Sequence, residues 1–238
     1  MESCATQLKD WSQIHGKGFL PRNLGLKYIT LDLPELLSCK KLRQPINIID
    51  AGAGIHNMGK YTLNAKKLHE DDSDSIWILK VFNTTAMVHA FEPNIKKSSE
   101  LLDAVKTREY SSKYFKNLNV INKGVGSNNT VSYLRKCGGE NTWRIGHGNC
   151  VIGEKVEVVS LDSFSFTISS PPVYVKVDVE GSELDVLKGM QNLLKKKQVE
   201  IASFEYAANW NKHFKLRREV TRQEINDIGN NTLNYFQK

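Results

Sequence analysis

The 238-residue sequence lacks several features that would assign it at once to a class of protein. It contains no run of about 18 apolar residues, so no membrane-spanning helix is expected. The segment from Met1 to Trp11 is polar and has no apolar stretch typical of a signal peptide. The four cysteines form no C-x-x-C pair. This pattern favours free thiols in a reducing compartment, and we expect a cytoplasmic location.

The sequence also lacks an arginine-rich tract with interleaved aromatic residues, although its formal net charge is +7. Its lysine clusters fall on separate predicted helices, at Lys66-Lys67, Lys96-Lys97 and Lys195-Lys196-Lys197. Dispersed positive charge favours a solvated basic surface over a dedicated nucleic-acid surface. A nucleic-acid partner is therefore the less favoured alternative.

Length and hydrophobic content predict one large domain with a short addition. Hydrophobic residues make up 40% of the chain, which is enough for a substantial core. Residues 1–45 show no strong periodicity, and glycine and proline interrupt their first half. We interpret residues 1–45 as an N-terminal cap segment and residues 46–238 as the main domain.

The segment from Asn47 to Ile55 is predicted to be a buried strand that runs into a glycine turn. Asp50 ends the strand, and Gly52 and Gly54 allow the backbone to turn sharply. A strand, a G-x-G turn and a helix together form the nucleotide-binding unit of doubly wound folds. Taken alone this pattern is equally compatible with an ordinary strand-to-helix turn.

A second apolar run, from Ala86 to Phe91, predicts another parallel strand that is buried on both faces. It ends in Glu92, whose carboxylate is suited to accept hydrogen bonds from both hydroxyls of a ribose. The alternative is a favourable charge at the start of the helix expected from about Asn94. His89, inside the strand, is expected to be a core histidine whose hydrogen bonds are satisfied.

Charged residues interrupt a third valine-rich strand, predicted from Val173 to about Gly181. Valines occupy one face, while Lys176, Asp178 and Glu180 alternate onto the other. Buried charges need a partner or a ligand, and ligands of open α/β sheets bind beyond the carboxyl ends of the strands. We therefore expect Asp178 and Glu180 to face the same crevice as the glycine turn. Their alternative roles are an ion pair with Lys176 and a cap on the next helix.

Other elements complete the expected order. A helix should begin at Ser182, with Asp185 forming a capping-box-like pair. Alternating residues at 130–134 and 155–161 indicate added β-strands. The remaining expectations are helices near 57–68, 75–82, 95–105 and 219–228, strands at 119–126 and 199–205, and a long glycine-rich loop at 137–144.

This order of motifs closely resembles the FkbM family of S-adenosylmethionine-dependent methyltransferases, from about Ile46 to Phe236. The specific part is the motif from Asp178 to Gly189, within the segment K-V-D-V-E-G-S-E-L-D-V-L-K-G. The F-E-P at Phe91–Pro93 and the S-L-D at Ser160–Asp162 agree with it. The resemblance implies an α/β, Rossmann-like class I methyltransferase fold. It has a mostly parallel central sheet of seven strands, helices on both faces and an added β-hairpin.

The resemblance also implies S-adenosyl-L-methionine as the cofactor and assigns residues to its parts. Asp178 and Glu180 would face the methyl group and the acceptor, and either could act as a catalytic base. The residues implied to bind the cofactor are Asp50, Ala51, Gly52, Ala53 and Gly54 along the methionine and ribose, Glu92 at the ribose, Gly124 and Val125 near the adenine, and Asp178 near the methyl group.

The expected reaction is O-methylation of a small-molecule or glycan hydroxyl, with Asp178 or Glu180 taking the proton. One alternative is methylation of RNA or protein by the same fold. Another is a non-catalytic module that binds cofactor or a partner, which Gly54 and His56 favour because they depart from the usual family turn. Metal-dependent transfer with Asp178 and Glu180 as oxygen ligands is a third alternative, although no histidine-rich set indicates a transition metal.

The chain ends where the final β-hairpin of the family would begin, so we expect either a truncated C-terminus or a sheet that is one strand short. The sequence specifies neither the acceptor nor the oligomeric state.

Overall fold

A computed structural model describes residues 45–54, 73–82, 86–106, 115–136, 143–145 and 151–204. Nearly all of the predicted cap segment, the helix expected near residue 57 and the elements expected after residue 204 lie outside these ranges. So do all four cysteines and His56. The architecture below concerns the described residues alone.

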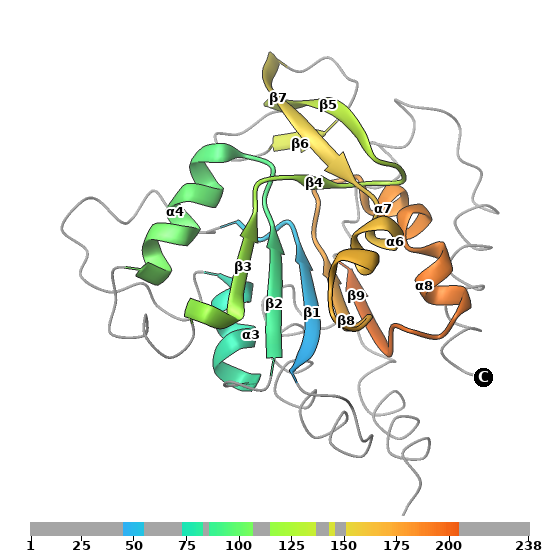
Figure 1. Cartoon of the computed structure of the whole chain (residues 1–238). Helices are drawn as coiled ribbons and strands as arrows, with labels where there is room; N and C mark the ends of the chain where they lie inside the picture. The colour runs from blue at the N-terminus through green and yellow to red at the C-terminus, as the bar shows by residue number, and fades with distance from the viewer. Residues whose placement is uncertain are drawn as a thin grey trace, which may run out of the picture.

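The central sheet is parallel and, within the described residues, has five strands in the order β3-β2-β1-β8-β9 (Figure 1). Their bounds are β1 Ile46–Ala51, β2 Ala86–Phe91, β3 Leu118–Ile121, β8 Pro172–Val177 and β9 Ile201–Phe204. Every residue of β1 and β8 is buried. Burial on both faces is why most of their residues are apolar, with Asn47, Asp50 and Lys176 as the exceptions. The predicted doubly wound α/β fold is confirmed.

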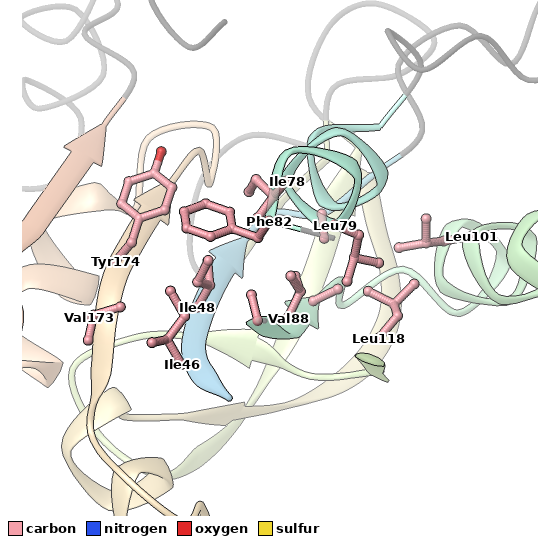
Figure 2. Close-up of a cluster of buried hydrophobic side chains, with 13 residues drawn as sticks. Ile46, Ile48, Ile78, Leu79, Phe82, Val88, Leu101, Leu118, Val173 and Tyr174 are labelled. Atoms are coloured by element: carbon pink, nitrogen blue, oxygen red, sulfur yellow. The ribbon is translucent and has the colours of Figure 1, made fainter. Parts of the chain in front are cut away.

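Helices cover both faces of this sheet. On one face lie α3 Asp74–Phe82 and α4 Ile95–Lys106, and on the other lie the short helices α6 Leu161–Phe164, α7 Glu183–Gly189 and α8 Gln191–Lys195. Successive side chains along each strand point to opposite faces of the sheet. Ile48 and Tyr174 pack with Phe82 of α3 (Figure 2), whereas Ile49 and Val175 belong to the core beneath α6, α7 and α8. The helices expected at 75–82 and 95–105 are confirmed.

A second sheet lies beyond the carboxyl ends of the central strands (Figure 1). Its strands are ordered β4-β7-β5-β6, with bounds β4 Gly124–Val125, β5 Thr130–Lys136, β6 Trp143–Ile145 and β7 Val151–Val159. β5 pairs antiparallel with both β6 and β7, so the added hairpin is confirmed. Glu154 of β7 accepts a hydrogen bond from the amide of Ile95 at 3.2 Å, which joins this sheet to the start of α4.

Three short features lie outside these layers. The 3-10 turns are η3 Phe115–Asn117 and η4 Ser165–Thr167. The third is a loop after β8, and it corrects two predictions. β8 ends at Val177, so the strand expected to continue toward Gly181 is shorter than predicted. The predicted capping box is also wrong, because the Ser182 side chain makes no capping hydrogen bond.

His89 is a core residue, as predicted. Its Nε2 lies 2.8 Å from Asn47 Oδ1 on β1, and its Nδ1 lies 3.3 Å from Asn119 Nδ2 on β3. Its ring packs edge-to-face against that of Phe164, with 5.2 Å between the ring centroids. Burial lowers the pKa of His89 to about 4, so the imidazole is neutral near pH 7. An amide donor at Nδ1 fits a tautomer in which Nε2–H donates to Asn47.

Candidate active site

The glycine turn after β1 is packed directly against the end of β8. Gly52 has φ 90°, and a Cβ placed there would lie 1.7 Å from the carbonyl oxygen of Asp178. The amide of Asp178 in turn donates to Ala51 O at 2.9 Å. Only glycine allows both the positive φ and this approach. The turn and Asp178 are therefore neighbours, as predicted.

The turn is also joined to β2. The amides of Gly52 and Ala53 both donate to the carbonyl oxygen of Phe91, each at 2.9 Å. These two N–H groups therefore connect the turn to β2. Ala51 and Ala53 are buried in the two cores, on opposite faces of the sheet. At the turn, the group facing Glu92 is the Cα of Gly54, because a Cβ there would lie 3.1 Å from Glu92 Oε2.

Glu92 occupies a buried position at the end of β2 and is only 6% exposed. Its Oε1 accepts a hydrogen bond from the amide of Asn94 at 2.8 Å. Asn94 then caps α4 by accepting from the amide of Lys97 at 3.0 Å. The carboxylate thus takes part in the turn at the start of α4, while its second oxygen faces Gly54. Burial raises the pKa of Glu92, although the Asn94 amide and the charge of Lys97 oppose the rise.

Lys176 lies at the centre of a charged cluster that spans three elements. Asp50 on β1 and Lys176 on β8 are register partners in the parallel sheet. The ammonium Nζ lies 2.8 Å from Asp74 Oδ2, 3.1 Å from Asp50 Oδ1 and 3.7 Å from Asp178 Oδ2. The ion pair between Lys176 and Asp178, one of the alternatives read from the sequence, is therefore present.

The two innermost members of this cluster are almost fully buried. The side chains of Lys176 and Asp50 are 4% and 0% exposed, while those of Asp74 and Asp178 are 22% and 21% exposed. Ser75 donates to Asp50 Oδ2 at 2.6 Å, so both carboxylate oxygens of Asp50 accept a hydrogen bond. Burial by itself lowers the pKa of Lys176, but the charges of the three aspartates hold it well above its usual range. Burial raises the pKa of Asp50, and Lys176 opposes this.

Glu180 does not take part in the ion pairs that Asp178 makes. It follows the end of β8, has φ 55° and is exposed, and it makes no hydrogen bond or ion pair with the described residues. The expected alternation of Asp178 and Glu180 on one strand face is wrong, since neither residue lies in the strand. Whether Glu180 contacts the acceptor stays a prediction.

Gly124 and Val125 form β4 beside β7 and are both buried. A Cβ on Gly124 would lie 2.1 Å from Cδ1 of Ile145, so the close approach recorded for this glycine is to β6. Val125 packs in the core beneath α6, α7 and α8. Their predicted proximity to adenine stays a prediction.

Two residues near Asp178 were missed from the sequence. Asp74 is the first residue of α3 and precedes by one position the helix expected at 75–82. Glu183 is 2% exposed, and its Oε1 accepts from the amide of Gly181 at 2.9 Å. Burial raises the pKa of Glu183. Its carboxylate therefore stabilises the loop after β8. The only feature of the sequence that could have indicated this role is its place in the V-E-G-S-E segment.

Comparison with known proteins identifies the family. The model of the methyltransferase FkbM domain matches residues 50–227, which is more than half of the chain. The chain therefore belongs to the FkbM methyltransferase domain family, as the sequence motifs indicated.

One solved structure that the chain resembles is a methyltransferase FkbM from Methylobacillus flagellatus KT. The two are 16% identical with a TM-score of 0.44, and the match covers 94% of this chain and 51% of that one. The chain thus spans about half the length of that protein. A search of the curated proteins found no match. None of the helices among the described residues is long and apolar enough to cross a membrane.

Proposed function

We propose that the chain is an S-adenosylmethionine-dependent methyltransferase that transfers a methyl group to a hydroxyl of a small molecule or glycan. Membership of the FkbM family supports the reaction class. The observation that carries the proposal is the meeting of three features at the carboxyl ends of β1, β2 and β8. They are the glycine turn, the buried carboxylate of Glu92 and the partly exposed carboxylate of Asp178.

The donor site is proposed around Glu92 and Gly54. A ribose diol has two donors, and a carboxylate offers two acceptor oxygens. Glu92 uses Oε1 for the amide of Asn94, while Oε2 borders the space that a side chain at Gly54 would fill. These residues fit a nucleoside whose ribose lies over the turn. Because Glu92 is buried, hydrogen bonds that it makes to a ligand are shielded from water.

Asp178 is the proposed base. When bound, S-adenosylmethionine supplies an electrophilic methyl group, whose transfer to oxygen breaks the carbon–sulfur bond and leaves the electron pair on sulfur. Asp178 is partly open to solvent, so its carboxylate can receive the proton that the acceptor hydroxyl loses. Its place beside Gly52 supports a position near the reacting atoms. Glu180 is the second candidate because it is exposed on the same loop.

The donor site is tested by calorimetric titration of the full chain with S-adenosylmethionine and S-adenosylhomocysteine. We expect Glu92→Ala to weaken binding roughly tenfold or more, which corresponds to about 1.4 kcal/mol. Glu157→Ala is the matched control, since it removes an exposed carboxylate from β7 in the second sheet. Failure of the folded wild-type chain to bind either compound would reject the proposal and favour a non-catalytic module.

The base is tested by an acceptor screen with radiolabelled methyl donor once binding is established. Asp178→Asn is expected to reduce turnover by roughly a hundredfold or more, the usual range for removal of a general base. Glu180→Gln is the paired variant that decides between the two carboxylates. If neither change lowered turnover while both variants remained folded, the catalytic assignment would be wrong.

The cytoplasmic location stays a prediction, which fractionation of cells that express the chain can test.

A further inference from the structure

The space above Gly54 is bordered by a cation as well as by the carboxylate of Glu92. A Cβ placed on Gly54 would lie 3.1 Å from Glu92 Oε2, 3.6 Å from Lys97 Cδ and 3.8 Å from Lys97 Nζ. A carboxylate oxygen and an ammonium nitrogen therefore lie within 4 Å of one point above the turn. The sequence indicated Lys97 only as part of a solvated basic surface.

The start of α4 explains why Lys97 reaches this point. Asn94 precedes the helix, and its Oδ1 accepts a hydrogen bond from the amide of Lys97 at 3.0 Å. The amide of Asn94 in turn donates to Glu92 Oε1 at 2.8 Å. Side chains of an α-helix lean toward its N-terminus, so the stem of Lys97 extends back toward Glu92. Asn94 thus connects the carboxylate to the backbone that carries the ammonium.

Lys97 differs in its surroundings from Lys96, the residue before it. Lys96 is exposed, whereas Lys97 is half-buried. The charge of Lys97 also acts on Glu92. Burial raises the pKa of Glu92, while the Asn94 amide and the charge of Lys97 oppose the rise. Lys97 therefore favours the ionised form of Glu92, in which both oxygens are acceptors.

An acceptor and a donor that border the same space suit a ligand with hydroxyl groups. Each hydroxyl of a ribose can donate one hydrogen bond and can also accept. A carboxylate only accepts, so Glu92 can satisfy only the donors of the diol. An ammonium only donates, so Lys97 offers the complementary group.

We propose that Lys97 is a binding residue for the ribose of the methyl donor, and that its ammonium donates a hydrogen bond to an oxygen of the diol. This role rests on the donor site proposed at Glu92 and Gly54. Each hydroxyl that Glu92 accepts from keeps lone pairs on its oxygen, which the ammonium can bind. Because the donor is charged, this hydrogen bond is stronger than one between neutral groups.

The test is calorimetric titration of the full chain with S-adenosylhomocysteine and with its 2′-deoxy and 3′-deoxy analogues. Lys97→Met keeps an apolar stem and removes the donor, so binding of S-adenosylhomocysteine should weaken roughly tenfold. For the analogue that lacks the contacted hydroxyl, the wild type and Lys97→Met should bind within about twofold of each other. Lys96→Met is the matched control. It removes an equal charge from an exposed position of the same helix, so affinity should stay within about twofold of the wild type.

Two results would overturn the proposal. One is equal affinity of Lys97→Met and Lys96→Met for S-adenosylhomocysteine. The other is an equal loss in Lys97→Met for all three ligands, because the lysine would then act through its charge or through the fold rather than on a hydroxyl. If Lys97→Met does not fold, Lys97→Gln repeats the comparison with an uncharged side chain that is one atom shorter, and the same dependence on one hydroxyl is expected.

The same titrations distinguish failure of this assignment from failure of the proposed function. If the folded wild type binds none of the three ligands, the donor site is rejected and the role of Lys97 is rejected with it. If the wild type binds and Glu92→Ala weakens binding while Lys97→Met does not, the proposed function stands and Lys97 is not part of the site.

Discussion

Acidification should destabilise the fold through His89, whose environment favours the neutral imidazole. Burial lowers its pKa from the ordinary 6.5 to about 4. The unfolded chain therefore takes up a proton on this residue at a higher pH than the folded chain does. Stability from this source is complete above pH 6.5 and is lost as the pH falls toward 4.

The magnitude follows from the size of the shift. One pKa unit corresponds to about 1.4 kcal/mol, so the full difference limits the effect to about 3 kcal/mol. At pH 5, where only part of the interval has been crossed, linkage gives a loss of about 2 kcal/mol. The structural cause is burial of the ring, which disfavours the charged imidazolium. Asn119 Nδ2 also lies 3.3 Å from Nδ1, so a second ring proton would face another donor.

The assay is urea denaturation at pH 7.5 and pH 5.0, on the wild type and on His89→Gln. The wild type should lose about 2 kcal/mol more between the two pH values than the variant does. Other titrating groups are common to both proteins and cancel in this comparison. The variant itself is expected to be less stable at both pH values, because a flexible amide cannot reproduce both contacts, to Asn47 and Asn119. Equal losses in the two proteins would refute the reasoning.

Two further predictions concern the ends of β1 and β8. Gly52→Ala should lower the free energy of unfolding by about 2–5 kcal/mol, since it adds a clash with Asp178 O to the strain of φ 90°. Gly181 has φ 103°, but a Cβ added there would have no atom within 4 Å, so Gly181→Ala should lower the free energy of unfolding by only about 1–2 kcal/mol. If denaturation gave the same loss of stability for both variants, the clash with Asp178 O would not be the cause. Lys176→Met should cost about 3–5 kcal/mol by leaving Asp50 buried and unpaired, and adding Asp50→Asn should recover part of this in a double-mutant cycle.

Local pattern was enough to predict most of the central sheet. A continuous apolar run predicted β2, and mostly apolar segments predicted β1 and β8, because a strand covered on both faces contains few polar positions. The G-x-G turn, the acid after β2 and the K-V-D-V-E-G segment indicated the family, which the domain match confirmed. His89 was correctly placed in the core since a histidine inside such a run has to find neutral partners on the neighbouring strands.

Predictions failed where the outcome depended on distant contacts. Alternating valines suggested that β8 continues toward Gly181, but the strand ends at Val177, before the positive φ values of Glu180 and Gly181. The capping box expected at Ser182 does not form, and the Glu183 carboxylate binds the amide of Gly181 instead.

By itself, therefore, the sequence determined the parallel sheet, the glycine turn and the residues that follow each strand, since these depend on neighbours along the chain. Only the tertiary structure decided which charges meet. Lys176 and Asp50 are 126 positions apart, and they become partners because β1 and β8 pair in parallel register. Asp74 joins them because α3 packs on the same face of the sheet. Burial of that face is what makes this pairing obligatory, because charges removed from water must find one another.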